Sequence, residues 1–245
     1  TWLSFHAHGV LHEMALAGHL PYLDAARLTA DVQRMCEAQL ALFEPEQSAR
    51  APFKRYVFMV DVRANGYGGL EHRDSTALLC ERADLPTLAQ SEQPRTDAYL
   101  VFLGLCSHEY FHAWNVKRIK PVPFVYYDFS NIVDTSLLWF FEGVTSYYDD
   151  LIMYRTGLLD ETQYLKKLEN TYNAVMRHDG VNVQTAHDSG WYAWTKYYQV
   201  SPNTPNAVVS YYSKGALIAL AMDQFIREHS AGRFSLDDVM RDLWT

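Results

Sequence analysis

The stretch Ser107-His108-Glu109-Tyr110-Phe111-His112 has the pattern H-E-x-x-H and lies in an apolar run from about Asp97 to Val116. In a helix, residues four positions apart project from one face, so His108 and His112 can hold one metal ion between their rings. Glu109, beside the first histidine, can reach a water molecule at the metal without binding the ion itself. The stretch therefore predicts a helix that carries a metal site.

The pattern could also arise by chance, and the surroundings of the motif argue against chance. The helix is apolar on nearly every side and should be buried, because its large side chains are Phe102, Leu103, Leu105, Cys106, Tyr110, Phe111 and Trp114. Two histidines and a carboxylate are costly to bury together unless a divalent cation compensates. Burial of the two histidines and the carboxylate in an apolar helix thus favours a bound metal ion over a chance pattern.

A third metal ligand is predicted in a second long helix, which we expect from about Thr135 to Gly157. Glu142 follows three large aromatic residues there, and an unpaired carboxylate in such a helix would be expensive to bury. It could pair with Lys117 or Arg118 instead of binding metal. Two histidines, one glutamate and an open position for water form the usual catalytic zinc site, so we favour Glu142 as the ligand. Ser146, one turn later, could orient a ligand.

Composition limits the classes of protein to which the chain can belong. It has 245 residues with 49% hydrophobic residues, enough for one large domain or two packed lobes, and a net charge of −8 without a basic run. This charge argues against nucleic acid as a partner. No apolar run is long enough to span a membrane within this segment. The three cysteines lack metal-type spacing, which indicates reduced thiols and a cytoplasmic location, with the periplasm as the alternative.

The remaining patterns predict strands followed by helices. The first 95 residues read as a strand-rich lobe with one helix, and residues 96–245 read as a helical lobe. We expect strands in Trp2–Ala17 and Arg55–Val62, helices in Asp24–Phe43, Asp160–Met176, Ser210–Glu228 and from Ser235, and a long aromatic loop over His178–Asn206. The chain ends within the last helix, so we expect a fragment of a longer protein.

A glycine pair follows the second strand region. Gly68 and Gly69 lie in a turn before Leu70-Glu71-His72, which could return as a further strand towards Cys80. Glycines let a backbone approach a ligand closely, but a tight hairpin would explain them equally well. His6, His8 and His12 have no acidic partner at useful spacing, so we expect no second metal site from them.

Four ordered motifs together resemble the glycyl aminopeptidase family of bacterial metallopeptidases, a gluzincin group related to aminopeptidase N. They are H-E-Y-F-H-A-W-N-V-K-R at 108–118, W-F-F-E-G-V-T-S-Y-Y at 139–148, G-G-L-E-H at 68–72 and Y-Y-S-K-G-A at 211–216. The resemblance implies an α+β fold, namely a thermolysin-like zinc metallopeptidase domain. In it a mixed-sheet lobe precedes a helical lobe, with the active site between them. It also implies flanking regions in the full-length protein, an N-terminal β-rich domain and a C-terminal PDZ domain.

The resemblance also implies residue roles. His108, His112 and Glu142 would bind one zinc ion, and Glu109 would be the general base. The G-G-L-E-H stretch is similar to a G-x-M-E-N strand whose glutamate binds the free α-amine of the substrate. It therefore points to Glu71, with Gly68 and Gly69 lining the substrate. Tyr212 matches the tyrosine that steadies the oxyanion in the relatives.

The function expected from these features is zinc-dependent hydrolysis of N-terminal peptide bonds, with a preference for small residues such as Gly or Ala. The substrate would be a peptide with a free N-terminus. A zinc endopeptidase of the same fold, in which Glu71 is merely structural, is the first alternative. An inactive zinc-bearing module that binds peptides is the second.

Overall fold

The computed structural model describes residues 1–45, 51–126, 128 and 130–245, and the chain divides into two compact units. Unit 1 comprises residues 1–118, 149–160 and 244, and unit 2 comprises residues 119–148, 161–243 and 245. This division differs from the predicted lobes, 1–95 and 96–245, because the helix with the metal motif packs on the sheet and belongs to unit 1. Among the described residues, no helix combines the length and apolarity that crossing a bilayer requires.

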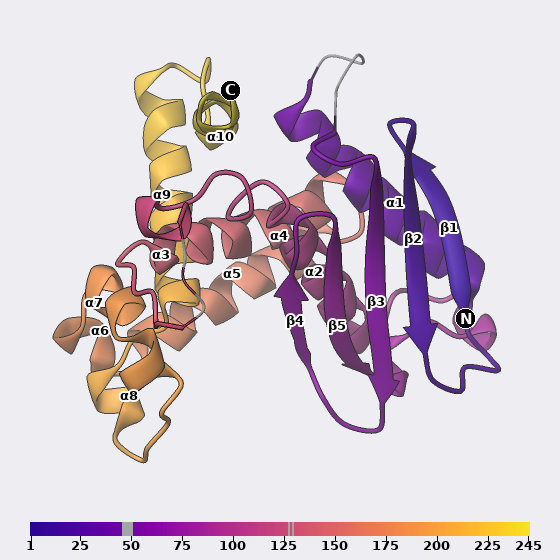
Figure 1. Ribbon diagram of the computed structural model, residues 1–245, viewed down its shortest axis with the longest axis horizontal. Coiled ribbons are helices and arrows are strands. Elements are labelled where there is room, and N and C mark those ends of the chain that lie inside the picture. The colour runs from indigo at the N-terminus through magenta and orange to yellow at the C-terminus, as the bar shows by residue number, and fades with distance from the viewer. Residues whose placement is uncertain (46–50, 127, 129) are drawn as a thin grey trace. The chain divides into compact units, whose positions relative to one another are not determined.

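Unit 1 is built on a five-stranded mixed sheet with the strand order β1-β2-β3-β5-β4 (Figure 1). β1 and β2 form an antiparallel hairpin, β2, β3 and β5 run parallel, and β4 is antiparallel to β5 at the edge. The strands are β1 (Trp2–Ala7), β2 (Val10–Ala17), β3 (Arg55–Arg63), β4 (Gly68–Glu71) and β5 (Ser75–Glu81). The α+β class and the strands predicted in the first 62 residues are confirmed.

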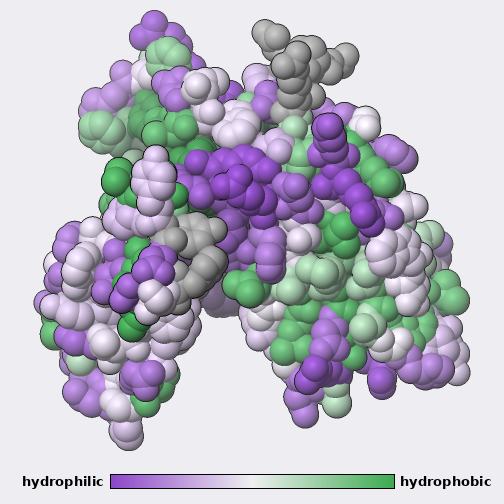
Figure 2. Space-filling model, in the orientation of Figure 1, coloured by the Kyte–Doolittle hydropathy of each residue, from purple (hydrophilic) through white to green (hydrophobic). Residues whose placement is uncertain are grey.

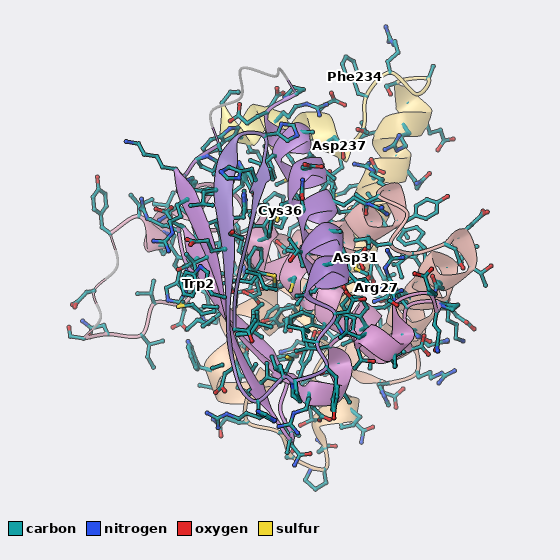
Figure 3. The ribbon with its side chains drawn as sticks, turned by 90° about the vertical axis from the view of Figure 1, so that its right-hand side faces the viewer. Trp2, Arg27, Asp31, Cys36, Phe234 and Asp237 are labelled. Atoms are coloured by element: carbon teal, nitrogen blue, oxygen red, sulfur yellow. The ribbon has the colours of Figure 1, made fainter. Side chains whose placement is uncertain are left out.

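Residues of β3 alternate between the two faces of this sheet. Tyr56, Phe58 and Val60 are buried, whereas Met59 between them is exposed. The helices of unit 1 lie on one side of the sheet, as the side view shows, and the first of them, α1 (Ala25–Phe43), carries Cys36 in its buried face (Figure 3). The opposite face shows hydrophobic side chains at the surface (Figure 2). Leu70 of the edge strand β4 is exposed.

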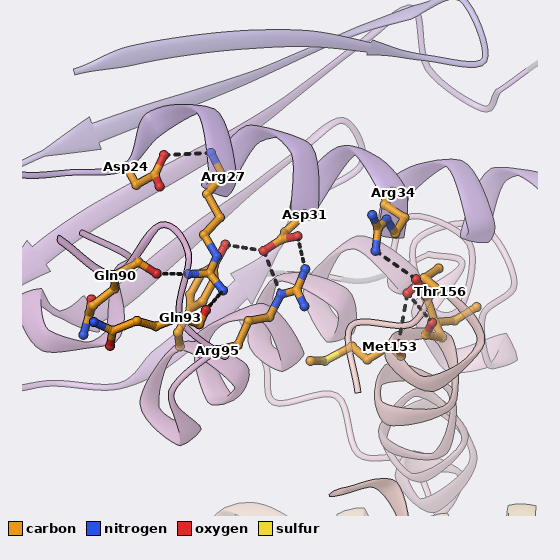
Figure 4. Close-up of polar contacts among 11 residues, drawn as sticks. Asp24, Arg27, Asp31, Arg34, Gln90, Gln93, Arg95, Met153 and Thr156 are labelled. Atoms are coloured by element: carbon orange, nitrogen blue, oxygen red, sulfur yellow. Dashed lines mark hydrogen bonds and ion pairs between the residues drawn. The ribbon is translucent and has the colours of Figure 1, made fainter. Parts of the chain in front are cut away.

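α1 forms as predicted, and its polar residues fasten the segment that leads to the metal motif. Asp24 caps the helix by accepting a hydrogen bond from the Arg27 backbone N–H. The Arg27 guanidinium donates to the carbonyls of Gln90 and Gln93, and the Arg95 guanidinium pairs with the buried carboxylate of Asp31 through two nitrogens (Figure 4). These contacts hold the loop after β5, which contains the short turns η1 (Arg82–Asp84) and η2 (Leu88–Gln90).

The helix with the metal motif, α2 (Asp97–Phe111), begins where the sequence predicts. The Thr96 hydroxyl accepts a hydrogen bond from the Tyr99 N–H, and α2 then packs against α1, β4 and β5. It ends earlier than the predicted Val116. His112 is its C-cap, and the carbonyl of His112 accepts from the N–H groups of both Val116 and Lys117, which closes the chain into turns.

Unit 2 is helical, as predicted for most of the second half of the chain. Its main elements are α5 (Glu161–Met176) and α9 (Tyr211–His229), which pack on each other (Figure 1). Ser210 caps α9 through its hydroxyl, and a capping box at Ser235 opens α10 (Leu236–Trp244). The turn η3 (Val122–Phe124) precedes these helices.

Two predictions for the second half of the chain were wrong. The helix expected over 135–157 is instead α3 (Leu138–Phe141) and α4 (Gly143–Arg155), separated at Glu142, and the Thr135 hydroxyl caps the turn before α3. The region expected to be one aromatic loop is a series of short helices. They are α6 (Gly180–Val183), α7 (Ala186–Trp191), the π-helical turn η4 (Ala193–Tyr197) and α8 (Thr204–Ala207).

Candidate metal centre and active site

His108 and His112 lie at the C-terminal end of α2 with ring centroids 4.7 Å apart and nearly perpendicular planes. His108 Nδ1 lies 3.0 Å from a carboxylate oxygen of Asp149, and His112 Nδ1 donates to the backbone carbonyl of Asn115 at 2.7 Å. Because these partners accept hydrogen bonds, both rings are held with the proton on Nδ1, which makes Nε2 the metal-binding atom of each.

The acceptor at His108, Asp149, was not identified from the sequence, which pointed to Ser146 for such a role. Asp149 lies on α4, and its backbone carbonyl also accepts a hydrogen bond from the Ser107 hydroxyl at 3.1 Å. Asp149 follows Glu142 by seven residues, or two helical turns, and this spacing is the signal that could have suggested it.

Glu109 touches the edge strand β4. Its carboxylate lies so close to Gly69 that a Cβ on Gly69 would stand only 2.6 Å from Glu109 Cγ, with the carboxylate atoms nearer still. The ligand atoms of Glu71, Glu109 and His112 all lie within 4.8 Å of one another. Unit 1 thus brings together the predicted base, one predicted histidine ligand and the predicted amine-binding glutamate. Gly68 differs from Gly69, because a Cβ on Gly68 would meet no atom within 4 Å.

β4 is not the partner of a tight hairpin with β3, because β5 lies between them in the sheet. The glycine pair is part of β4 itself, and Gly69 is the position at which the backbone must come close to another group. Of the two explanations considered from the sequence, close approach of the backbone to another group therefore applies to Gly69. The group that the backbone approaches is the Glu109 side chain.

Glu71, the last residue of β4, is paired with a lysine. Lys117 Nζ lies 2.9 Å from Glu71 Oε1, and Arg118 pairs with Asp74 in the turn between β4 and β5 at 3.0 Å. The two cations that could have neutralised Glu142 are thus engaged within unit 1. Sequence analysis assigned Lys117 no role at Glu71.

Unit 2 carries the other two predicted site residues, Glu142 and Tyr212. Glu142 is the C-cap of α3 with a right-handed helical backbone, φ −93° and ψ −43°. Tyr212 is the second residue of α9, and burial, followed by the negative charge of Glu142, raises the pKa of its hydroxyl. Tyr212 therefore stays protonated across the physiological range and can donate a hydrogen bond.

Further tyrosines surround Tyr212. The Tyr211 hydroxyl donates to the Tyr198 hydroxyl at 3.1 Å, and the hydroxyls of Tyr198 and Tyr212 lie 3.3 Å apart. The rings of Tyr211 and Tyr212 stack with centroids 4.6 Å apart. This cluster fixes the side chain of Tyr212 through groups that the sequence did not identify.

His12, one of the three histidines of the β1–β2 hairpin, is a core residue. Its side chain is fully buried, with Nε2 2.8 Å from the Tyr110 hydroxyl and Nδ1 2.9 Å from the Val10 carbonyl. Burial lowers the pKa of His12 to about 4, so the ring is neutral at physiological pH.

The donor set of unit 1 fits a divalent metal. It offers two imidazoles with their Nδ1 atoms held by acceptors and carboxylates close to them, which is the chemistry of a zinc or similar site.

Comparison with known proteins agrees with this reading. A family model described as M61 glycyl aminopeptidase matches residues 101–218, which include the metal motif and the start of α9. The crystal structure of an aminopeptidase N family protein from Idiomarina loihiensis is 47% identical to the chain, with a TM-score of 0.94. Both comparisons support the assignment of the chain to the glycyl aminopeptidase family. The match with this structure covers 100% of the chain and 40% of that protein, so the chain spans less than half the length of this relative. No curated protein matches the chain.

Proposed function

We propose that the chain is the catalytic part of a zinc-dependent aminopeptidase with a thermolysin-like, gluzincin fold. The observation that carries the proposal is the pair His108–His112, oriented by Asp149 and Asn115, with Glu109 beside it. The M61 family match and the related aminopeptidase N family structure support a peptidase.

His108 and His112 would hold the zinc ion, and Glu142 would complete the ligand set. Support for Glu142 comes from the composition of the site, because two histidines and one glutamate are the usual protein ligands of a catalytic zinc ion. A bound zinc ion would polarise the scissile carbonyl and lower the pKa of a water molecule towards about 7.

The residues of the chain would then handle the proton and the charge of the reaction. Glu109 takes the proton from the attacking water and passes it to the leaving amine. Tyr212, kept neutral by its raised pKa, donates a hydrogen bond to the oxygen that becomes negatively charged. Glu71 binds the α-ammonium of the substrate and so limits cleavage to the first residue, with Gly68 and Gly69 lining the substrate along β4.

The mechanism is tested by the variant Glu109→Gln in the full-length protein. The amide has nearly the shape of the carboxylate but cannot take the proton, so turnover should be lost while the zinc content stays at one ion per chain. Turnover of Glu109→Gln close to that of the wild type would refute the role of Glu109 as the base.

An endopeptidase is the second candidate, and the pairing of Glu71 with Lys117 is the observation that favours it. The two candidates differ in their response to a blocked amine. An aminopeptidase should cleave alanine p-nitroanilide and fail on its N-acetylated form, whereas equal cleavage of both would remove the amine-binding role of Glu71. A panel of aminoacyl p-nitroanilides would test the proposed preference for Gly and Ala.

The context of the M61 domain is also proposed. We propose that the full-length protein has an N-terminal β-rich domain and a C-terminal PDZ domain, and the greater length of the related protein supports this. A cytoplasmic location is proposed on the three buried free cysteines, Cys36, Cys80 and Cys106. Fractionation of cells that produce the full-length protein would test the location.

A further inference from the structure

Lys117 places an ammonium group on the carboxylate that is proposed to bind the substrate ammonium. Its Nζ lies 2.9 Å from Glu71 Oε1, and the two side chains are 28% and 20% exposed. This partial burial matters, because an ion pair that is mostly removed from water is screened less than one on the open surface. The negative charge of Glu71 is therefore already compensated before any substrate arrives.

The backbone fixes Lys117 in this position. Its N–H bonds to the carbonyl of His112 at 3.0 Å, so the lysine belongs to the turn that directly follows the metal motif. The next residue, Arg118, donates to the carbonyl of Arg73 at 2.9 Å and pairs with Asp74. Lys117 thus contacts the end of β4, and Arg118 contacts the turn after it. These contacts keep Lys117 within reach of Glu71.

Two effects of Lys117 on substrate binding oppose each other. The lysine orients Glu71, which helps any ligand of that carboxylate, but it also adds a positive charge next to the place where the α-ammonium must bind. Ordering one partly exposed carboxylate is a small effect, as for most partly exposed ion pairs. Repulsion between two ammonium groups on one carboxylate in a partly desolvated site is larger, enough to weaken binding about tenfold. The repulsion should win.

We propose that Lys117 is a specificity residue that competes with the substrate α-ammonium for Glu71 and thereby limits the preference of the site for free N-termini over blocked ones. The proposal rests on the proposed aminopeptidase function and assigns a regulating group to the same site. A substrate with a free amine must displace or share the Lys117 contact, whereas a substrate with a blocked amine leaves the ion pair in place.

The test compares Lys117→Met with the wild type in the full-length zinc-loaded protein. Methionine keeps much of the length of the aliphatic stem and removes the charge. We expect KM for alanine p-nitroanilide to fall about tenfold with kcat nearly unchanged, because a like charge is removed. The N-acetylated compound is followed as an inhibitor, and its inhibition constant should not change. A rise in KM for the free amine, no change, or an equal fall in KM and in the inhibition constant of the blocked compound would overturn the proposal.

Two further variants separate charge from disturbance of the fold. Lys117→Arg keeps the positive charge and should retain a KM close to the wild-type value. Lys166→Met removes a lysine whose Nζ lies 2.6 Å from Glu169 on the surface of α5, and it should leave both substrates unaffected. If Lys117→Met does not fold, Lys117→Gln serves in its place.

A binding measurement keeps this proposal separate from the proposed function. Titration calorimetry of alanine amide into Glu109→Gln and into the double variant Glu109→Gln/Lys117→Met reads the amine site without turnover. Tighter binding by the double variant, about tenfold, supports the competition even if the wild type proves to cleave neither substrate. Equal binding refutes the competition, even if aminopeptidase activity is confirmed.

Discussion

The substitution Gly69→Ala should disable Glu109 while leaving the fold intact. An alanine Cβ at this position would stand 2.6 Å from Glu109 Cγ, whereas ordinary contact begins at 3.4 Å, so the side chain must withdraw by at least 3.4 − 2.6 = 0.8 Å. The carboxylate, which is nearer to the added methyl group, must move further. A shift of about 1 Å in a reacting group can cost roughly a hundredfold in rate, and we expect kcat to fall by about that factor.

Stability should respond much less than rate in Gly69→Ala. The obstructing atoms belong to the movable end of one side chain, and replacing glycine by alanine also restricts the unfolded chain. We expect the free energy of unfolding in urea to change by less than about 1 kcal/mol. kcat is measured on alanine p-nitroanilide at saturating concentration, so that changes in substrate binding do not enter.

Gly68→Ala is the matched control, because a Cβ there meets no atom within 4 Å. Gly68 is a proposed substrate contact, so its KM can change, but its kcat should fall far less than that of Gly69→Ala. Similar kcat values for the two variants, or a loss of stability that accounts for the loss of rate in Gly69→Ala, would refute the reasoning.

Three other predictions follow from the contacts around the site and the core. Asp149→Ala removes the acceptor at His108 Nδ1 and should weaken zinc binding about ten- to a hundredfold, as measured by competition with a chelating dye; unchanged affinity would contradict the orienting role. Tyr198→Phe removes a hydroxyl 3.3 Å from that of Tyr212 and should lower kcat several-fold, less than the roughly hundredfold loss expected for Tyr212→Phe. The double variant should be no slower than Tyr212→Phe alone, and additive losses would show that the two hydroxyls act independently. The pKa of His12 is lowered from 6.5 to about 4 in the folded protein. As the pH falls, His12 is therefore protonated in the unfolded chain before it is protonated in the folded chain. The folded state loses stability between pH 6.5 and about pH 4 as a result. Urea unfolding at pH 7 and pH 4.5 should show this loss, of order 3 kcal/mol when complete, in the wild type but not in His12→Gln.

The elements that the sequence predicted well are those whose signals are local. Thr96 opens α2 with its own hydroxyl, and the four-residue spacing of His108 and His112 gives both rings one face whatever surrounds them. The order β3-β5-β4 could not be read in the same way, because pairing between strands is decided by contacts distant in sequence. The short helices in 180–207 have four to six residues each, too few for a helical period to stand out.

Site residues that belong to a sequence motif were predicted individually. Their partners that lie far away in the sequence were not predicted. Glu71 was identified from a motif, but its partner Lys117 lies 46 positions later and was considered only as a partner for Glu142. Asp149 lies 41 residues after the histidine that it orients. Supporting contacts of this kind depend on tertiary packing, which periodicity and spacing do not describe.

Within unit 2, Gly143 at the start of α4 and Gly215 in α9 meet backbone to backbone. A Cβ on Gly143 would stand 2.6 Å from the carbonyl carbon of Gly215, and a Cβ on Gly215 would stand 2.8 Å from Gly143 Cα. Glu142 immediately precedes the first glycine, and Tyr212 comes three residues before the second. Direct contact between two main chains therefore sets the distance between the backbone segments that carry Glu142 and Tyr212. Repacking of side chains elsewhere in unit 2 would leave this distance unchanged.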